Sequence, residues 1–186
     1  MKRILTWVIL VGVMTVGLYL FFSNRASINP SAPNDCGPQA LVALLAEYRI
    51  RTSPESVALL AGTDAEGTTM IGLKRVVESH GITCDGMRLR ADQLRAKLEE
   101  GHGVIAFVNG DHYVHVKNAH SLGFVVKDRD PGYRFVPMDE WGKIWFDDPD
   151  DAVTNGEGMC LVLAPPPFYR PRPKPYSPVK APQSAS

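Results

Sequence analysis

The sequence has no excess of charge of either sign. Its 186 residues include 20 lysines and arginines and 20 aspartates and glutamates. A nucleic-acid-binding domain usually carries a basic excess, because its contacts with phosphates need cations. The charge balance therefore gives no reason to expect a nucleic acid as partner, and we expect none.

Motifs for metal and nucleotide binding are also missing. The three cysteines include no C-x-x-C pair, which is a common cysteine spacing in zinc sites. The acidic stretch 147–151 lacks the EF-hand pattern. His112 and His115 are three residues apart, so on an expected strand their side chains face opposite sides. No G-x-x-x-x-G-K-[ST] motif for nucleotide phosphates occurs. We therefore expect neither a metal nor a cofactor.

Only one long hydrophobic run occurs, from Ile4 to Phe22. A helix of that length can cross the hydrocarbon core of a bilayer. Lys2 and Arg3 precede the run and only Arg25 follows closely, so the positive-inside rule places the N-terminus in the cytoplasm. We predict a retained signal-anchor helix within residues 1–22. A cleaved signal peptide stays open, although its apolar region is usually shorter and no clear A-x-A site follows.

Composition divides the rest of the chain into three parts. Residues 23–33 form a short polar linker interrupted by prolines. Residues 34–164 have the length and patterning of one folded domain with one core. Residues 165–186 are rich in proline, basic residues and serine, so we expect an extended, disordered tail. The partner of the tail and the oligomeric state stay open.

Helix signals come first in the domain and strand signals follow. Four helices are expected, at 36–48, from 53–54 to 61, from 68–69 to 80, and at 92–100. The first is apolar on all sides, which is typical of a buried helix. Five strands are expected, at 104–108, 113–116, 124–126, 134–136 and 160–163. This order predicts an α+β domain with a central N-terminal helix and an antiparallel sheet.

One cysteine, one histidine and one carboxylate are placed as thiol catalysis requires. Cys36 lies at the start of the first helix, after Asp35, where the helix dipole and a nearby imidazolium lower the pKa of a thiol. Its backbone amide is a candidate oxyanion donor. His112 opens one expected strand and Asp130 closes the next, so the two meet if these strands pair. Asp128 lies on the same strand face as Asp130, so periodicity does not choose between them.

These residues resemble the motifs of the peptidase C39 family, the bacteriocin-processing, double-glycine-leader cysteine peptidases. The motifs are D-C-G-P at 35–38, G-T at 67–68, H-G-I at 80–82, D-H-Y-V-H-V at 111–116 and D-P at 130–131. The resemblance implies a papain-like fold. It implies that Cys36 is the nucleophile, that His112 is the general base and acid, and that Asp130 orients His112.

One position departs from the family pattern. The family usually has a glutamine about six residues before the cysteine, where it helps to bind the oxyanion. Pro30 occupies that position here, and Asn29 precedes it with a shorter side chain. Loss of one such donor slows catalysis on the order of a hundred- to a thousandfold. Whether Asn29 replaces the glutamine stays open.

Four further side chains each have two interpretations. Cys84 and Cys160 lie in apparent strands, where they can pair in an exported domain or remain buried free thiols. Trp141 and Trp145 can line a peptide groove or fill the core.

The sequence as a whole predicts a membrane-anchored cysteine peptidase whose catalytic domain lies on the extracytoplasmic side of a bacterial membrane. It would cleave a peptide or protein through a thioester on Cys36, and the resemblance alone implies cleavage after Gly-Gly. Family members often belong to ATP-driven exporters. Because no motif for nucleotide phosphates occurs in this sequence, we expect any exporter to be a separate chain. An inactive peptide-binding module and a thiol acyltransferase are the alternatives. The physiological substrate and its cleavage site stay open.

Overall fold

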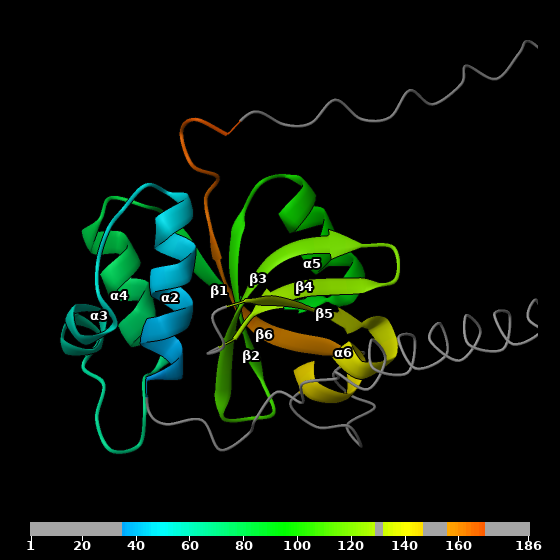
Figure 1. Ribbon diagram of the computed structural model, residues 1–186, viewed down its shortest axis with the longest axis horizontal. Helices are drawn as coiled ribbons and strands as arrows, with labels where there is room; N and C mark the ends of the chain where they lie inside the picture. The colour runs from blue at the N-terminus through cyan, green and yellow to red at the C-terminus, as the bar shows by residue number, and fades with distance from the viewer. Residues whose placement is uncertain (1–34, 129–131, 147–155, 170–186) are drawn as a thin grey trace, which may run out of the picture.

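The computed structural model describes residues 35–128, 132–146 and 156–169 (Figure 1). The expected anchor at 1–22, the linker at 23–33 and Asp130 lie outside these ranges. Within them, no helix combines the length and the apolar character needed to cross a bilayer.

In the described ranges, six antiparallel strands form one sheet, in the order β1-β6-β2-β3-β4-β5. The strands are β1 (Cys84–Arg90), β2 (Gly103–Val108), β3 (His112–His120), β4 (Gly123–Lys127), β5 (Tyr133–Pro137) and β6 (Glu157–Leu163). The five expected strands are confirmed, and β1 contains the apparent strand position of Cys84. Short turns join β2 to β3 and β3 to β4, so the middle of the sheet is built from sequence neighbours.

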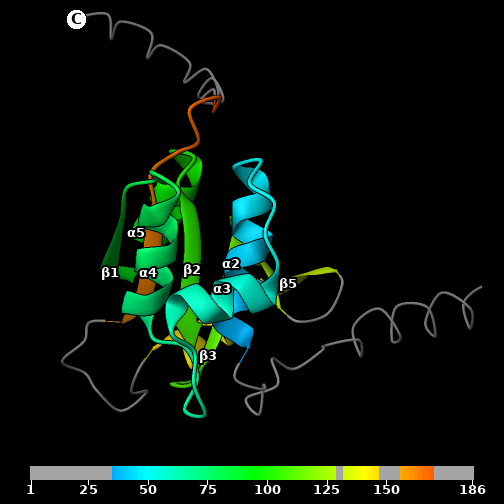
Figure 2. The same ribbon diagram turned by 90° about the vertical axis from the view of Figure 1, so that its left-hand side faces the viewer.

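Helices cover both faces of this sheet (Figures 1 and 2). The helices α2 (Cys36–Glu47), α3 (Pro54–Ala61) and α4 (Met70–Ser79) lie on one face, and α5 (Ala91–Glu99) and α6 (Met138–Trp145) on the other. The four expected helices are confirmed as α2 to α5. The helix α6 was not expected. The α+β class with an antiparallel sheet is confirmed.

Side-chain caps define the starts of α3 and α4. The Ser53 side chain accepts a hydrogen bond from the Ser56 amide, and the Thr69 side chain accepts one from the Gly72 amide. Each such cap stabilises a helix by about 1 kcal/mol. The Thr69 cap also fixes the end of the loop between α3 and α4, which lines the candidate site.

Each face of the sheet packs into its own hydrophobic core. Alternating residues divide between the faces, so that Ile105 packs under α2 and Val104 packs on the other side. In α2, Leu41, Leu44 and Leu45 are fully buried. Burial of each leucine side chain contributes about 1.5–3 kcal/mol, which holds α2 firmly against the sheet.

The second core contains both tryptophans of α6. Trp141 and Trp145 are fully buried, and their rings lie 5.2 Å apart between centroids. Trp141 also packs on Phe124 of β4, with a centroid distance of 4.8 Å. The core interpretation of the tryptophans is therefore correct, and the groove interpretation is wrong.

Cys84 and Cys160 are both buried free thiols. Cys84 belongs to the core under α2 and Cys160 to the opposite core, so the sheet separates them. Burial raises the pKa of Cys84 to about 11 and that of Cys160 to about 12. Both thiols therefore remain protonated and unreactive at neutral pH.

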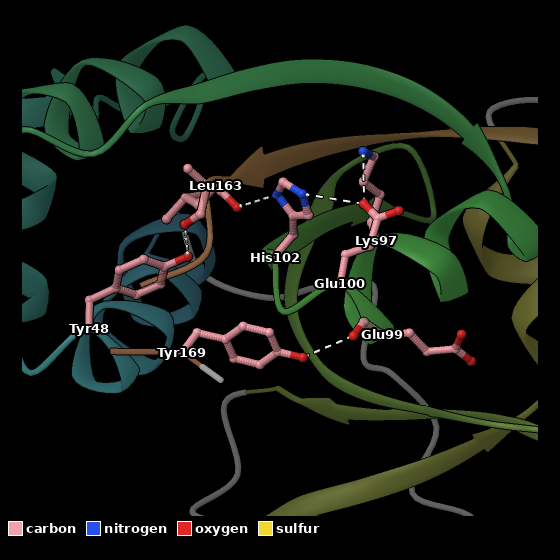
Figure 3. A network of polar contacts seen from close by, with 8 residues as sticks. Tyr48, Lys97, Glu99, Glu100, His102, Leu163 and Tyr169 are labelled. Carbon is pink, nitrogen blue, oxygen red and sulfur yellow. Dashed lines mark hydrogen bonds and ion pairs between the residues drawn. The ribbon is translucent and has the colours of Figure 1, made fainter. Parts of the chain in front are cut away.

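The segment after β6 packs across one end of the domain (Figure 3). Tyr48 donates a hydrogen bond from its hydroxyl to the Ala164 carbonyl at 2.7 Å, and His102 donates one from Nδ1 to the Leu163 carbonyl at 2.9 Å. The Tyr169 hydroxyl donates to the Glu99 carbonyl at 2.9 Å. The folded part of the chain therefore extends at least to Tyr169, beyond the expected boundary at 164.

Gly101 makes this docking sterically feasible. Its φ is +87°, and a Cβ atom there would lie 2.3 Å from the Tyr169 ring. Only glycine combines this backbone conformation with so close an approach. The docked segment lies at the upper end of both views, whereas α2 begins with Cys36 at the lower end (Figures 1 and 2).

Candidate active site

The topology brings three chemically active side chains to one end of the sheet. Cys36 is the first residue of α2, and His112 is the first residue of β3. Asp128 follows the last residue of β4. Because β3 and β4 are antiparallel, the start of one strand lies beside the end of the other. The expected pairing of these two strands is therefore confirmed.

His112 is held by a carboxylate. Its ring is fully buried, and its Nε2 donates a hydrogen bond to Oδ1 of Asp128 at 2.8 Å. The Asp128 side chain is 13% exposed, so water screens this contact only weakly. Asp130, which the Asp-Pro motif favours, lies outside the described residues. Its role stays a prediction, and the carboxylate that the structure shows on the ring is Asp128.

The Cys36 thiol is activated by its neighbours. Burial acts to raise its pKa, but a hydrogen bond with the His112 side chain, backbone hydrogen bonds from Tyr113 and Gly37, and the charge of His112 outweigh it. The pKa of Cys36 is therefore lowered from its ordinary value. The two backbone donors are the amide of Gly37, which follows Cys36, and the amide of Tyr113, which follows His112. The backbone beside each catalytic residue therefore stabilises the thiolate.

The His112 imidazole is stabilised in its charged form. Burial acts to lower its pKa, but the hydrogen bonds with Asp128 and Cys36 and the charges of both groups raise the pKa to about 9. The lowered pKa of Cys36 and the raised pKa of His112 therefore both favour a thiolate beside an imidazolium. This is the reactive form of a thiol nucleophile with a proton ready for transfer.

The two nitrogens of the His112 ring have separate roles. With Nε2 bonded to Asp128, Nδ1 is the atom left to face the cysteine. Nδ1 is buried and meets no atom of the described residues in full hydrogen-bond geometry. Since Cys36 and His112 nevertheless interact by hydrogen bond and charge, their contact is longer or less linear than an ideal bond. Such contacts in free enzymes often tighten when substrate binds.

A groove of about 530 Å³ opens beside Cys36. One wall comes from residues 66–71, which include the loop before α4 and its first turn. The other wall comes from the turn between β2 and β3 and from Phe107, Tyr113 and Met159. A cavity of this size can hold a few residues of an extended peptide.

Gly37 packs tightly against two side chains that line the groove. A Cβ atom at this position would lie 3.0 Å from the Thr68 Cβ and 3.3 Å from Cδ2 of Tyr113. A larger residue at position 37 would therefore displace these neighbours.

The start of α2 offers donors for a negatively charged oxygen. The Asp35 side chain makes no capping bond to the helix and instead accepts a hydrogen bond from Nε2 of Gln39 at 2.5 Å. The Cys36 amide therefore remains a candidate oxyanion donor at the positive end of the helix dipole. Asn29, the candidate second donor, lies outside the described residues.

His115 takes no part in this site. It points to the α2 side of the sheet, where its Nε2 lies 3.4 Å from Oε1 of Glu47. Burial, together with the charges of Lys117 and Lys127, lowers its pKa to about 3, so the ring is neutral. The contact with Glu47 is therefore not an ion pair between two charged groups. In the described ranges, no three or more histidine, cysteine or carboxylate side chains gather in a way that could hold a metal.

Comparisons with known proteins agree with this geometry. The sequence pattern of the peptidase C39 family matches residues 25–147. An uncharacterized protein of Methanothermobacter marburgensis is 33% identical over 128 residues, covering 67% of this chain and 86% of that protein. The lactococcin transport/processing ATP-binding protein LcnC-like of Lactococcus lactis is 29% identical over 140 residues. That match covers 74% of this chain but 18% of the transporter.

The fold has a solved counterpart. The crystal structure of a double glycine motif protease from an AMS/PCAT transporter, in complex with its leader peptide, superposes with a TM-score of 0.60 at 22% identity. The match covers 73% of this chain and 87% of that one. At this identity the likeness establishes the fold, which is papain-like.

Proposed function

The chain belongs to the peptidase C39 family of cysteine peptidases, and we propose that it cleaves peptides after small residues with Cys36 as nucleophile, His112 as acid and base, and Asp128 as the orienting residue. The observation that carries this proposal is the buried Cys36–His112 pair, in which the pKa shifts of both side chains favour thiolate and imidazolium, with a carboxylate 2.8 Å behind the ring. A protein that only binds peptides has no need for a charged pair, since burial opposes both charges.

The first half of the reaction forms a thioester. The Cys36 sulfur attacks the scissile carbonyl carbon, and the electron pair of the carbonyl moves onto its oxygen. The Cys36 amide stabilises that oxygen, and Asn29 is the proposed second donor. As the tetrahedral intermediate collapses, the C–N bond breaks and Nδ1 of His112 gives its proton to the leaving amine.

The second half of the reaction releases the acid. His112 is now neutral, so Nδ1 takes a proton from water as the water oxygen attacks the thioester carbon. The C–S bond breaks, and the thiolate and the imidazolium are restored. Throughout, Asp128 holds the Nε2 proton, which keeps Nδ1 turned toward sulfur and substrate.

The relatives support a substrate with small residues before the cut. The solved relative is a double glycine motif protease that holds its leader peptide, and the Lactococcus relative is a transport/processing protein. A Gly-Gly leader peptide is therefore the proposed substrate class.

The cellular setting is proposed from the sequence. The apolar run from Ile4 to Phe22 would anchor the domain on the extracytoplasmic side of the membrane.

Cleavage of a Gly-Gly peptide by the purified chain is the direct test. Wild type should release two products that mass spectrometry identifies, and Cys36→Ala should release none. Cys84→Ala is the matched control, because it removes a buried thiol that does not line the groove. Binding without cleavage by wild type would favour a peptide-binding module. Products joined to an added amine in place of water would favour an acyltransferase.

A further inference from the structure

Two carboxylates line the groove beside Cys36, and within the described part of the chain no lysine or arginine does. They are Glu66, from the loop before α4, and Asp111, from the turn between β2 and β3. Both are exposed, and neither makes an ion pair with another described residue. An unpaired charge in a substrate groove acts on whatever the groove binds.

The backbone holds Glu66 in place. The amides of Asp64 and Gly67 donate hydrogen bonds to each other's carbonyls at 3.1 Å and 3.2 Å. The Glu66 amide donates to Oδ1 of Asp64 at 2.8 Å. Three hydrogen bonds within four residues make a tight turn, so the Glu66 side chain starts from a fixed point on the rim of the groove.

Asp111 is held by an equally tight turn. Asn109 and Gly110 both have positive φ, at 55° and 75°. The Asn109 amide donates to the Ile144 carbonyl of α6 at 2.6 Å, and the Asp111 amide donates to the Val108 carbonyl at 3.4 Å. These bonds connect the turn to two neighbouring elements, so Asp111 also has a defined position.

The rest of the groove lining is mostly apolar. It includes Met70, Ile71, Phe107 and Met159. Among the described residues that line the groove, Glu66 and Asp111 are the carboxylates, and both add negative charge to it.

A long apolar stem with a cationic head matches this lining. Lysine and arginine side chains bury their methylene groups on apolar surface and keep the charged end near water. In this groove the stem would lie on the apolar wall, and the head would reach a rim carboxylate. Acidic peptides would meet repulsion at both rims.

We propose that Glu66 and Asp111 select substrates with a lysine or arginine close to the scissile bond. This inference rests on the proposed peptidase function and specifies its substrate class. It makes Glu66 and Asp111 specificity-determining residues, which act on binding and leave the chemistry to Cys36 and His112.

The test is a series of short peptides with one central Gly-Gly, in which a single lysine is moved through the positions on either side. Each lysine peptide is compared with its N-acetyl-lysine twin, which keeps the stem and lacks the charge. At the preferred position, kcat/KM should be about five- to tenfold higher for lysine, as expected for two exposed ion pairs. About 0.5 M salt should reduce that ratio, since it shortens the Debye length.

Rim variants assign the effect to the two residues. Glu66→Gln and Asp111→Asn should each lower the lysine preference about two- to fourfold and leave kcat/KM for the N-acetyl-lysine peptide nearly unchanged. Glu99→Gln and Asp139→Asn are the matched controls, since both remove an exposed carboxylate outside the groove lining. They should leave the preference intact.

The outcomes separate this inference from the proposed function. Equal kcat/KM for lysine and N-acetyl-lysine at every position would overturn the charge selection and leave the peptidase function standing. Absence of any cleavage would contradict the peptidase function. In that case, fluorescence anisotropy of the same peptides on Cys36→Ala would measure the charge preference directly, and equal affinities would overturn it as well.

Discussion

Two aspartates compete for one role beside His112. Asp128 accepts a hydrogen bond from Nε2 of the ring, while Asp130 belongs to the Asp-Pro motif. A hydrogen bond to a charged group contributes about 1.5–3 kcal/mol, which corresponds to about 10- to 100-fold in rate. We therefore expect Asp128→Asn to lower kcat/KM for a Gly-Gly peptide by about that factor.

Asp130→Asn is the matched variant, with the same change of charge two residues away. If Asp128 alone orients the ring, the kcat/KM of Asp130→Asn should stay within about threefold of wild type. A large loss in Asp130→Asn with little loss in Asp128→Asn would reverse the assignment. An equal loss in both would mean that the carboxylates act together.

The pKa values of the catalytic pair predict a pH window for reactivity. The thiolate forms above the lowered pKa of Cys36, and the imidazolium persists up to about pH 9. Alkylation of Cys36 by iodoacetamide should therefore be fast well below the free-thiol pKa of about 8.5. Peptide cleavage should fall as the pH rises through about 9, because His112 then has no proton to donate.

His112→Ala supplies the comparison for the pH profile. Without the imidazolium, burial raises the pKa of the Cys36 thiol. Alkylation should then become slow at neutral pH and rise only under alkaline conditions. A wild-type profile that follows an ordinary thiol, unchanged in His112→Ala, would show that the pair is not assembled.

Sequence motifs identified Cys36 and His112, and strand pairing explains why they and a carboxylate meet. A helix start and two strand ends are features that the sequence shows directly. The choice between Asp128 and Asp130 depends on where β4 ends relative to His112, which the sequence does not show. Residues two apart in an extended strand share a side, so alternation contains no information about that choice.

At the scale of elements, the contact between α3 and α4 controls the groove wall. Gly72 lies inside α4, where a Cβ atom would be 2.3 Å from the Ala61 carbonyl oxygen. Glycine costs about 1 kcal/mol inside a helix, so close packing is the physical reason for it here. Gly72→Ala should lower the free energy of unfolding by about 1–3 kcal/mol through overpacking, and denaturant titration measures this.

The same substitution should also reduce catalysis, because α4 begins beside the groove residues Thr69 and Met70. Gly86→Ala is the control. Its Cβ would meet only the Met70 sulfur, at an ordinary 3.6 Å. It should change the free energy of unfolding by less than about 0.5 kcal/mol. A stabilised Gly72→Ala protein would contradict the packing argument.

The helices with local signals were predictable, and the one without them was not. A serine or threonine cap marks the starts of α3 and α4. The helix α6 follows Pro137 and has no side-chain cap. Its Trp141 packs against Phe124 of β4, so tertiary contacts stabilise this helix. Contacts with a separate strand cannot be recognised from the eight residues of α6 alone.

At the scale of the whole molecule, the proposed anchor can be tested by fractionation. The full chain should sediment with membranes and resist alkaline carbonate extraction, because a run of about 19 apolar residues is sufficient to span a bilayer. Deletion of residues 1–22 should release nearly all of the protein. Deletion of residues 170–186 is the control and should leave the protein in the membrane fraction.

A full-length chain found in the carbonate supernatant would contradict the anchor. Intact mass then identifies the reason. A mass that lacks the first residues would indicate a cleaved signal peptide, and a complete mass would show that the apolar run is not inserted.

The two ends of the described chain have opposite positions relative to the groove. Cys36 opens α2 at one end of the domain, and the docked segment up to Tyr169 packs at the other (Figures 1 and 2). The end at which the domain is tethered therefore determines whether the groove beside Cys36 faces the tether or the solvent. Coupled to a resin through its C-terminal side, the domain would present the groove to dissolved peptides. Coupled through its N-terminal side, it would turn the groove toward the support.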